Sequence, residues 1–502
     1  MLKNIGSNWL AIALTVAATY VLTPFVIDAL GREGYGVWVL ITAMTGYMSL
    51  LALGVPMACV RFLAQHVAEK DLPAVNKVVG TCAGLYLTIG GCALAVGAVL
   101  AFFFDRIYDV PPAFQAQAPI AFGLMAVNVA FSFIGLLPEG VMFAHHDFIT
   151  RNVVRVCGVL LRLALTIGLL SLGASLVSLA LVQVSCLALD FGLTWLIVQR
   201  RYRGVRIDVR DFDWVVLRRI FSFSLYVLVL IAGGRLSFET DALVIGAFRG
   251  VGDISYYVVA NSIIVCLMDF VVAIASVVSP MTTKLRTEGQ TEPLRDMFLK
   301  WSKVAFSLTV MAAVFLAVLG PRFIGWWIDP GFERPSGQVL QILALSTLPF
   351  LPVRGVALPV MMGLGKPKIP TLAFLGAGLL NLALSIALIG PYGLAGVAIG
   401  TAIPNVLFSF VVLIVACREL GVTFMSYVKY VVPRAALAGV PLLALLLWCR
   451  DGLHVQSLTG LVAAGSSMVL LFGVIAIVFV YRGDPYVDVR NQLMLRRIWK
   501  WS

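Results

Sequence analysis

The chain has 502 residues, of which 61% are hydrophobic and only 12% are charged. A soluble protein of this length needs far more polar surface, so the composition excludes a sizeable soluble domain. The net charge of +12 indicates that basic residues lie in loops that face anionic lipid. We therefore do not expect nucleic-acid binding.

Apolar runs fill nearly the whole chain, and a helix that crosses a bilayer needs about 20 apolar residues. The sequence therefore predicts an all-α polytopic membrane protein with about 14 transmembrane helices. Proline inside such a span predicts a kink, because neighbouring helices can satisfy the freed carbonyl groups. The predicted spans are 8–29, 35–60, 78–104, 119–140, 152–172, 175–198, 221–246, 253–280, 300–327, 339–363, 369–389, 394–417, 431–449 and 458–481.

The first polar turn, 30–38, lies between the first two predicted spans. Gly31, Gly34 and Gly36 favour a sharp reversal there, because glycine adopts backbone angles that other residues avoid. A related turn occurs half a chain later at 245–253. A second repeat links the fifth and eleventh spans, in which the apolar octamer 163–170 matches 382–389.

The two repeats have almost the same offset, which predicts two six-helix lobes of equal orientation. Their pseudo-symmetry axis would lie along the membrane normal. In the segments that join and follow the lobes we expect a short interfacial helix at 211–220 and an amphipathic tail. The predicted divisions are an N-terminal lobe at 1–198, a basic cytoplasmic linker at 199–220, a C-terminal lobe at 221–417, two additional spans at 418–481, and a cytoplasmic tail at 482–502.

Most lysines and arginines of the loops fall on the side of the amino terminus. Because cytoplasmic loops carry an excess of positive residues, this pattern predicts that both termini are cytoplasmic. The opposite loops contain only Arg32, Arg106, Arg249, Arg322, Arg334 and Arg450.

The run 31–38, with Gly46, Tyr47, Leu53, Gly54 and Arg61 behind it, resembles the amino-terminal signature of bacterial polysaccharide transporters. These are the O-antigen-type flippases of the multidrug/oligosaccharidyl-lipid/polysaccharide superfamily. The segment 240–246, followed by Tyr256 and Tyr257, resembles the matching signature of the seventh span. Relatives often carry an acid before the Leu–Gly pair of the second span, whereas this chain has Ala52.

Charged residues inside predicted spans are candidates for function, since each costs about 2.5–3.5 kcal/mol at the bilayer centre. Arg162 and Arg155 share a helical face with Arg151 and form a basic stripe in the fifth span. Arginine binds phosphate oxygens with two parallel hydrogen bonds, and the resemblance implies a pyrophosphate on the substrate. The alternative is that Arg151 and Arg155 reach the interface and that Arg162 pairs with a neighbouring acid. The substrate-binding candidates are Arg162, Arg155, Arg61, Arg235 and Arg354.

The acids allow two interpretations, as ion-pair partners or as sites for coupling to H⁺ or Na⁺. Arg235 and Glu239 lie four residues apart and favour an ion pair on one helix. Asp241 stays open between a coupling role and polar packing, and Asp269 between an ion or proton site and a partner for an arginine. For 145–147, two histidines and an aspartate without further ligands, we expect no metal, and we expect no cofactor.

The resemblance implies a flippase that moves an undecaprenyl-pyrophosphate-linked oligosaccharide across the bacterial inner membrane by alternating access, for polysaccharide biosynthesis. Its expected partners are the lipid-linked substrate, membrane lipids and other polysaccharide assembly proteins. One alternative is a drug/cation antiporter of the same superfamily. A membrane glycan polymerase or ligase is disfavoured, because the outer loops are short and hold no acid/base pair. We therefore expect a protein that is not an enzyme.

Overall fold

The computed structural model describes residues 2–52, 54–173 and 175–487, and these residues form helices and turns without a strand. Eleven helical segments in this part of the chain are long and apolar enough to cross a membrane. Helices α1 (Leu2–Met48) and α16 (Lys368–Glu419) each contain a non-helical glycine, Gly31 and Gly393, and so join two predicted spans. The predicted all-α polytopic fold is confirmed.

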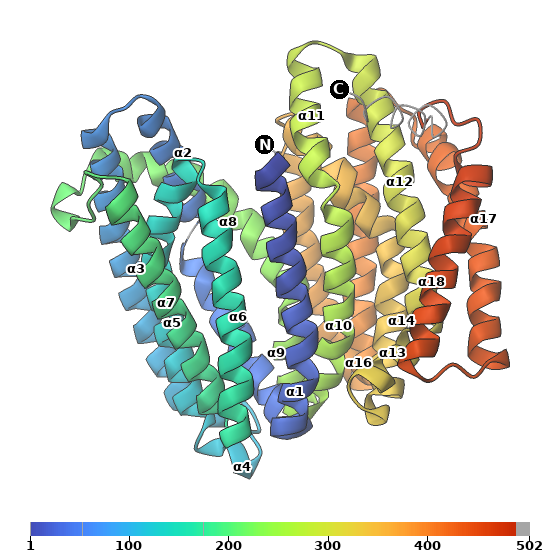
Figure 1. Cartoon of the computed structure of the whole chain (residues 1–502), viewed down its shortest axis with the longest axis horizontal. Helices are drawn as coiled ribbons and strands as arrows, with labels where there is room; N and C mark the ends of the chain where they lie inside the picture. Colours follow the sequence, from blue (N-terminus) through green and yellow to red (C-terminus); the bar gives the residue numbers. More distant parts are fainter. Residues whose placement is uncertain (1, 53, 174, 488–502) are drawn as a thin grey trace. The chain divides into compact units, whose positions relative to one another are not determined.

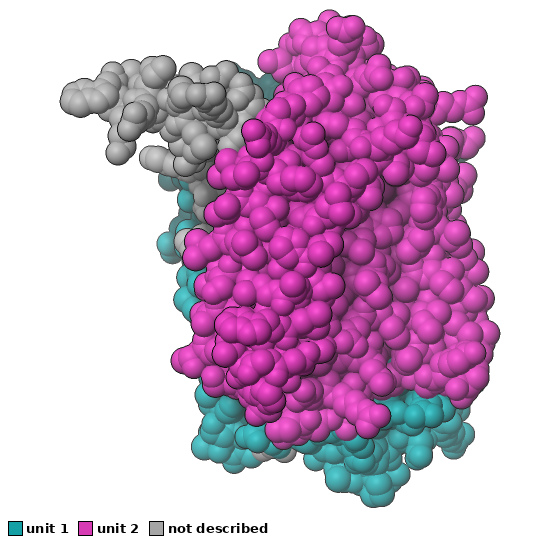
Figure 2. Space-filling model, turned by 90° about the vertical axis from the view of Figure 1, so that its right-hand side faces the viewer, with its two compact units in different colours: residues 1–255 teal, residues 256–502 magenta. Residues whose placement is uncertain are grey.

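Residue contacts divide the chain into two compact units, residues 1–255 and residues 256–502 (Figure 2). The division falls inside helix α10 (Val251–Val272). The lobe boundaries predicted from the repeat, with the linker at 199–220, stay a prediction, because a division by contacts does not test a repeat.

Unit 1 is built from long helices that run side by side (Figure 1). Helix α5 (Ala118–Ala144) packs against α3 (Leu72–Ile107) and α7 (Leu176–Arg201), while α6 (Phe148–Leu172) packs against α1 and α7. This arrangement places the basic stripe of α6 beside α7. The other helices of unit 1 are α2 (Val55–Ala68), α4 (Pro112–Gln115), α8 (Trp214–Phe238) and α9 (Thr240–Phe248).

Unit 2 is organised around α12 (Thr291–Val318), which packs against α14 (Pro330–Pro352) and α17 (Phe424–Leu447). The predicted additional pair of spans corresponds to α17 and α18 (Leu458–Ile475). Leu442, Leu461 and Met468 from this pair share one buried core with Val318, so the pair packs as part of unit 2. The remaining helices are α11 (Ala275–Thr287), α13 (Gly320–Trp327) and α15 (Leu358–Gly363).

The two repeated turns both contain a glycine with a left-handed backbone, Gly31 (φ 72°) and Gly250 (φ 100°). The turns pack against each other within unit 1, where the Ser255 hydroxyl donates to the carbonyl of Arg32 at 2.6 Å. A Cβ atom on Gly36 would lie 1.9 Å from the carbonyl oxygen of Val251. Gly36 therefore serves close packing, and only Gly31 supplies the positive φ of the first turn.

Several predicted spans are interrupted. The span predicted at 35–60 ends with the 3₁₀ turn Ser49–Ala52, and Gly54 (φ 73°) precedes a new helix, α2. The span at 221–246 is divided at Glu239 into α8 and α9, and the span at 253–280 into α10 and α11. The span at 339–363 contains a π-helical turn, Val353–Ala357. Apolar composition predicts burial in the membrane, but it does not reveal these breaks.

The predicted separate interfacial helix at 211–220 is wrong. Residues from Trp214 onward form the first turns of α8, because the Asp213 carboxylate caps the helix by accepting hydrogen bonds from the amides of Val215 and Val216 at 2.7 and 3.3 Å. Most of the predicted amphipathic tail, including Leu493, Ile498 and Trp499, lies outside the described residues.

Candidate functional site

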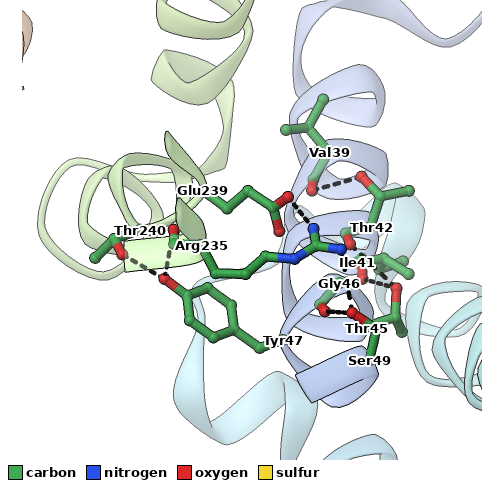
Figure 3. A network of polar contacts seen from close by, with 10 residues as sticks. All are labelled: Val39, Ile41, Thr42, Thr45, Gly46, Tyr47, Ser49, Arg235, Glu239 and Thr240. Carbon is green, nitrogen blue, oxygen red and sulfur yellow. Dashed lines mark hydrogen bonds and ion pairs between the residues drawn. The ribbon is translucent and has the colours of Figure 1, made fainter. Parts of the chain in front are cut away.

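A polar network in unit 1 joins the end of α1 to the break between α8 and α9 (Figure 3). The Arg235 guanidinium forms an ion pair with Glu239, one helical turn later, and donates to the Ser49 hydroxyl at 3.1 Å. Both charged side chains are only partly buried, with 29% and 31% of their surface exposed. The ion-pair interpretation of Arg235 and Glu239 is therefore confirmed, and neither charge is isolated.

Tyr47 forms the second connection of this network. Its hydroxyl donates to the carbonyl of Arg235 at 3.1 Å and also makes a short hydrogen bond with the Thr240 hydroxyl (Figure 3). The carbonyl of Arg235 lies where α8 ends, so Tyr47 binds the helix at its interruption. The network thus places charged and hydroxyl groups around a break in the backbone.

Gly46 allows the ion pair to approach α1 closely. A Cβ atom at this position would lie 2.6 Å from Glu239 Oε2 and 3.0 Å from Arg235 Nη1. A side chain at this position would displace the ends of Glu239 and Arg235, so glycine favours the close contact. Asp241 follows in the first turn of α9, where it is buried with 3% of its surface exposed.

The basic stripe on α6 is neutralised at the start of the helix, where Arg151 lies. Arg151 forms ion pairs with Glu139 of α5 at 3.1 Å and with Asp190 of α7 at 2.9 Å. Both acids lie inside predicted spans. Arg151 therefore links three helices and has a structural role.

Arg162 lies near the middle of α6, and its side chain is exposed, as is that of Arg155. Neither arginine forms an ion pair with a described residue. Helix α6 contains no acid, and the one acid of α7, Asp190, already binds Arg151. No ion pair joins Arg162 to an acid among the described residues, and the alternative in which it pairs with a carboxylate on a neighbouring helix stays a prediction.

The other candidates belong to other helices. Arg61 is exposed on α2. Arg354 lies in the π-helical turn of unit 2, with its guanidinium carbon 5.9 Å and 5.0 Å from the ring centres of Phe350 and Phe374. Such contacts stabilise a buried cation. Asp269 of α10 is exposed, and its charge acts on Arg354 without reaching ion-pair distance.

The segment 145–147 packs locally. The Asp147 carboxylate forms an ion pair with Arg201 at 2.6 Å and accepts hydrogen bonds from Thr150 at 2.6 Å and Tyr202 at 2.8 Å. Burial opposes ionisation, yet these hydrogen bonds and the Arg201 charge hold the pKa of Asp147 below its usual value. His145 lies against the Tyr202 ring, at 4.1 Å between ring centres. Among the described residues no cluster of three or more His, Cys, Asp or Glu side chains could hold a metal.

Sequence reasoning did not identify Ser49, Tyr47 or Thr240 as site residues. In the sequence alone, these three residues look like ordinary polar residues on helix surfaces. Only the approach of α1 to the α8–α9 break gives them shared partners. The available signal was the family resemblance, which includes the Gly46–Tyr47 pair and the segment 240–246.

A family model described as "Polysaccharide biosynthesis protein" matches residues 1–286. The chain belongs to this polysaccharide biosynthesis family. A relative from Shigella flexneri named "Putative O-antigen transporter" is 21% identical over 420 residues, which cover 81% of this chain and 95% of the relative.

Two solved structures share the fold. The inward closed conformation of the lipid II flippase MurJ matches with a TM-score of 0.73 and 13% identity, over 96% of this chain and 99% of MurJ. An inward-facing multidrug resistance MATE family transporter of the MOP superfamily matches with a TM-score of 0.66 and 18% identity, over 80% of this chain and 94% of the transporter. At these identities the matches establish a multi-pass membrane transporter fold.

Proposed function

We propose that this protein is a flippase that moves an undecaprenyl-pyrophosphate-linked oligosaccharide from the cytoplasmic to the outer leaflet of a bacterial inner membrane by alternating access. Membership of the polysaccharide biosynthesis family, the name of the Shigella flexneri relative and the likeness to a lipid II flippase support this proposal. Its residues bind and release a substrate without changing its bonds, so it acts as a transporter and not as an enzyme.

Arg162 is the observation that carries the proposal. It places a guanidinium near the middle of α6, with an exposed side chain and no ion pair to a described acid. A charge at that depth costs about 2.5–3.5 kcal/mol, which a purely structural role does not offset. A pyrophosphate is the group that a guanidinium binds best, with two parallel hydrogen bonds, and Arg155 supplies a second cation on the same face.

The experiment measures surface glycan in a host that lacks its own flippase. We expect Arg162→Ala to abolish transport while protein abundance in the membrane stays normal, because no carboxylate loses its partner. Arg162→Lys keeps the charge but loses the planar fork, so it should retain partial transport. Loss of a hydrogen bond to a charged group weakens binding by about tenfold or more.

Arg151→Ala is the matched control on the same helix. It leaves Glu139 and Asp190 without their cation, at a cost of about 3–5 kcal/mol, and should lower protein abundance. Normal glycan with Arg162→Ala would rule out a phosphate-binding role. A loss of abundance equal to that of Arg151→Ala would make Arg162 a structural residue.

The alternative is a drug/cation antiporter, which the likeness to a MATE transporter favours. That match covers 80% of the chain, whereas the MurJ match covers 96%. Deletion of the gene distinguishes the two functions. Loss of drug resistance with unchanged surface glycan would support the antiporter, and the reverse result the flippase.

We further propose that both termini are cytoplasmic and that other polysaccharide assembly proteins are partners. The excess of basic residues in the loops on one side supports the orientation. If transport is coupled to H⁺ or Na⁺, the acids to test are Glu239, Asp241 and Asp269, of which Glu239 pairs with Arg235.

A further inference from the structure

One end of unit 2 contains a pocket of about 570 Å³ that is separate from the candidate site. The end of α12, α13, the start of α14 and the π-helical turn Trp448–Gly452 form its walls. Arg322, Arg334 and Arg450, three of the few arginines predicted on the outer side of the membrane, line it together. Its volume is within the range of about 300–1,000 Å³ typical of small-ligand sites.

Two of these arginines are held in fixed positions. Arg322 Nη1 donates to the carbonyl oxygens of Arg450 at 2.7 Å and Val455 at 3.1 Å, which uses a single nitrogen of its guanidinium. Arg450 binds both carboxylate oxygens of Asp451, at 2.7 and 2.9 Å. The hydrogen bonds of Arg322 to two backbone carbonyls reduce the cost of ordering this side chain, whereas the pair of Arg450 with Asp451 is exposed, at 37% and 60%.

Arg334 is the cation available to a ligand. Its side chain is exposed at the start of α14, and it forms no ion pair with a described residue. Its neighbour Glu333 packs toward α13, since a Cβ atom on Gly325 would lie 3.0 Å from Glu333 Oε2. Gln338 and Gln341 add amide groups to the same lining. The lining thus holds three guanidinium groups and one carboxylate, Glu333, while a second carboxylate outside the lining, Asp451, pairs with Arg450.

We propose that this pocket binds an anionic, oxygen-rich group of saccharide size, a sugar that carries a carboxylate or a phosphate. The guanidinium groups match the geometry of carboxylate and phosphate oxygens, and the two amides can bind hydroxyl groups. The anion comes either from a glycan or from the headgroup of an anionic lipid, and both share this chemistry. The inference does not depend on the flippase function.

The test uses the purified full chain in phosphatidylcholine nanodiscs. Calorimetric titration measures binding of glucuronate, inorganic phosphate and, as a neutral sugar, glucose. Native mass spectrometry counts phosphatidylglycerol bound to the same protein. We expect glucuronate or phosphatidylglycerol to bind, and Arg334→Gln to weaken that binding by at least about tenfold. Glucose should bind more weakly than glucuronate.

Arg106→Gln is the matched control, because Arg106 is an exposed outer arginine outside the pocket. It should bind every probe as the unchanged protein does. Loss of glucuronate binding in Arg334→Gln identifies a glycan site, and loss of phosphatidylglycerol alone identifies a headgroup site. Equal binding by Arg334→Gln and the unchanged protein, or equal binding of glucose and glucuronate, would overturn the proposal.

Discussion

A buried ion pair fixes the end of the described chain to the core of unit 2. Lys303 of α12 pairs with Asp484, and their side chains are 2% and 0% exposed. The Asp484 carboxylate also accepts hydrogen bonds from the Tyr430 hydroxyl at 2.7 Å and from the amides of Tyr486 and Val487 at 3.0 and 3.1 Å. Removal of Asp484 would therefore disconnect several groups together.

Substitution of Asp484 and substitution of Lys303 should not destabilise the protein equally. Asp484→Ala leaves the Lys303 ammonium buried beside the ring of Tyr430, 4.6 Å from its centre, with no carboxylate. We expect this change to cost about 3–5 kcal/mol. Lys303→Met leaves Asp484 with a hydroxyl and two amide donors, so its cost should lie at or below the lower end of that range. The double variant Lys303→Met with Asp484→Asn should recover most of the stability that Asp484→Ala loses.

The assay is thermal unfolding of the detergent-solubilised protein. For Asp484→Ala we expect the midpoint to fall by about 3–5 °C. Glu419→Ala is the control, because its pair with Lys366 is exposed, at 54% and 30%, and contributes about 0–1 kcal/mol. Equal shifts for the two variants, or no recovery in the double variant, would refute the argument.

Three further predictions concern backbone contact, pH and orientation. Gly36→Ala should lower the unfolding midpoint markedly, because its Cβ would lie 1.9 Å from Val251 O, whereas Gly91→Ala should be tolerated in open space. Burial opposes ionisation of Asp484, but hydrogen bonds and the Lys303 charge lower its pKa below 3.8. The ionised carboxylate therefore stabilises the fold above pH 3.8, and this stabilisation is lost as the pH falls further. Unfolding measured over a series of acidic pH values, with Asp484→Asn as the comparison, should detect the loss. Cysteines placed one at a time in 200–219 of a cysteine-free variant should resist an impermeant thiol reagent in intact cells, and labelling there would contradict the predicted orientation.

The sequence predicted what depends on local pattern. Hydropathy predicted the membrane fold, the glycine turns at 30–38 and 245–253 are present, and the spacing of Arg235 and Glu239 predicted their ion pair. Contacts between distant segments were not predictable. Nothing in the sequence indicates that Arg151, and not Arg162, would receive the acids of α5 and α7, since that depends on helix rotation. The sequence likewise does not indicate that Lys303 pairs with Asp484 in a buried position.

The segment from α14 through the π-helical turn to α15 contains Pro349, Pro352 and Pro359. Each proline lacks an N–H group, so this segment has fewer hydrogen bonds along its axis than a regular helix of the same length. Together with the wider π turn, this lowers the energy needed to bend it. Arg354 therefore lies in a part of its helix that bends more easily than a regular helix, and bending there would move its charge.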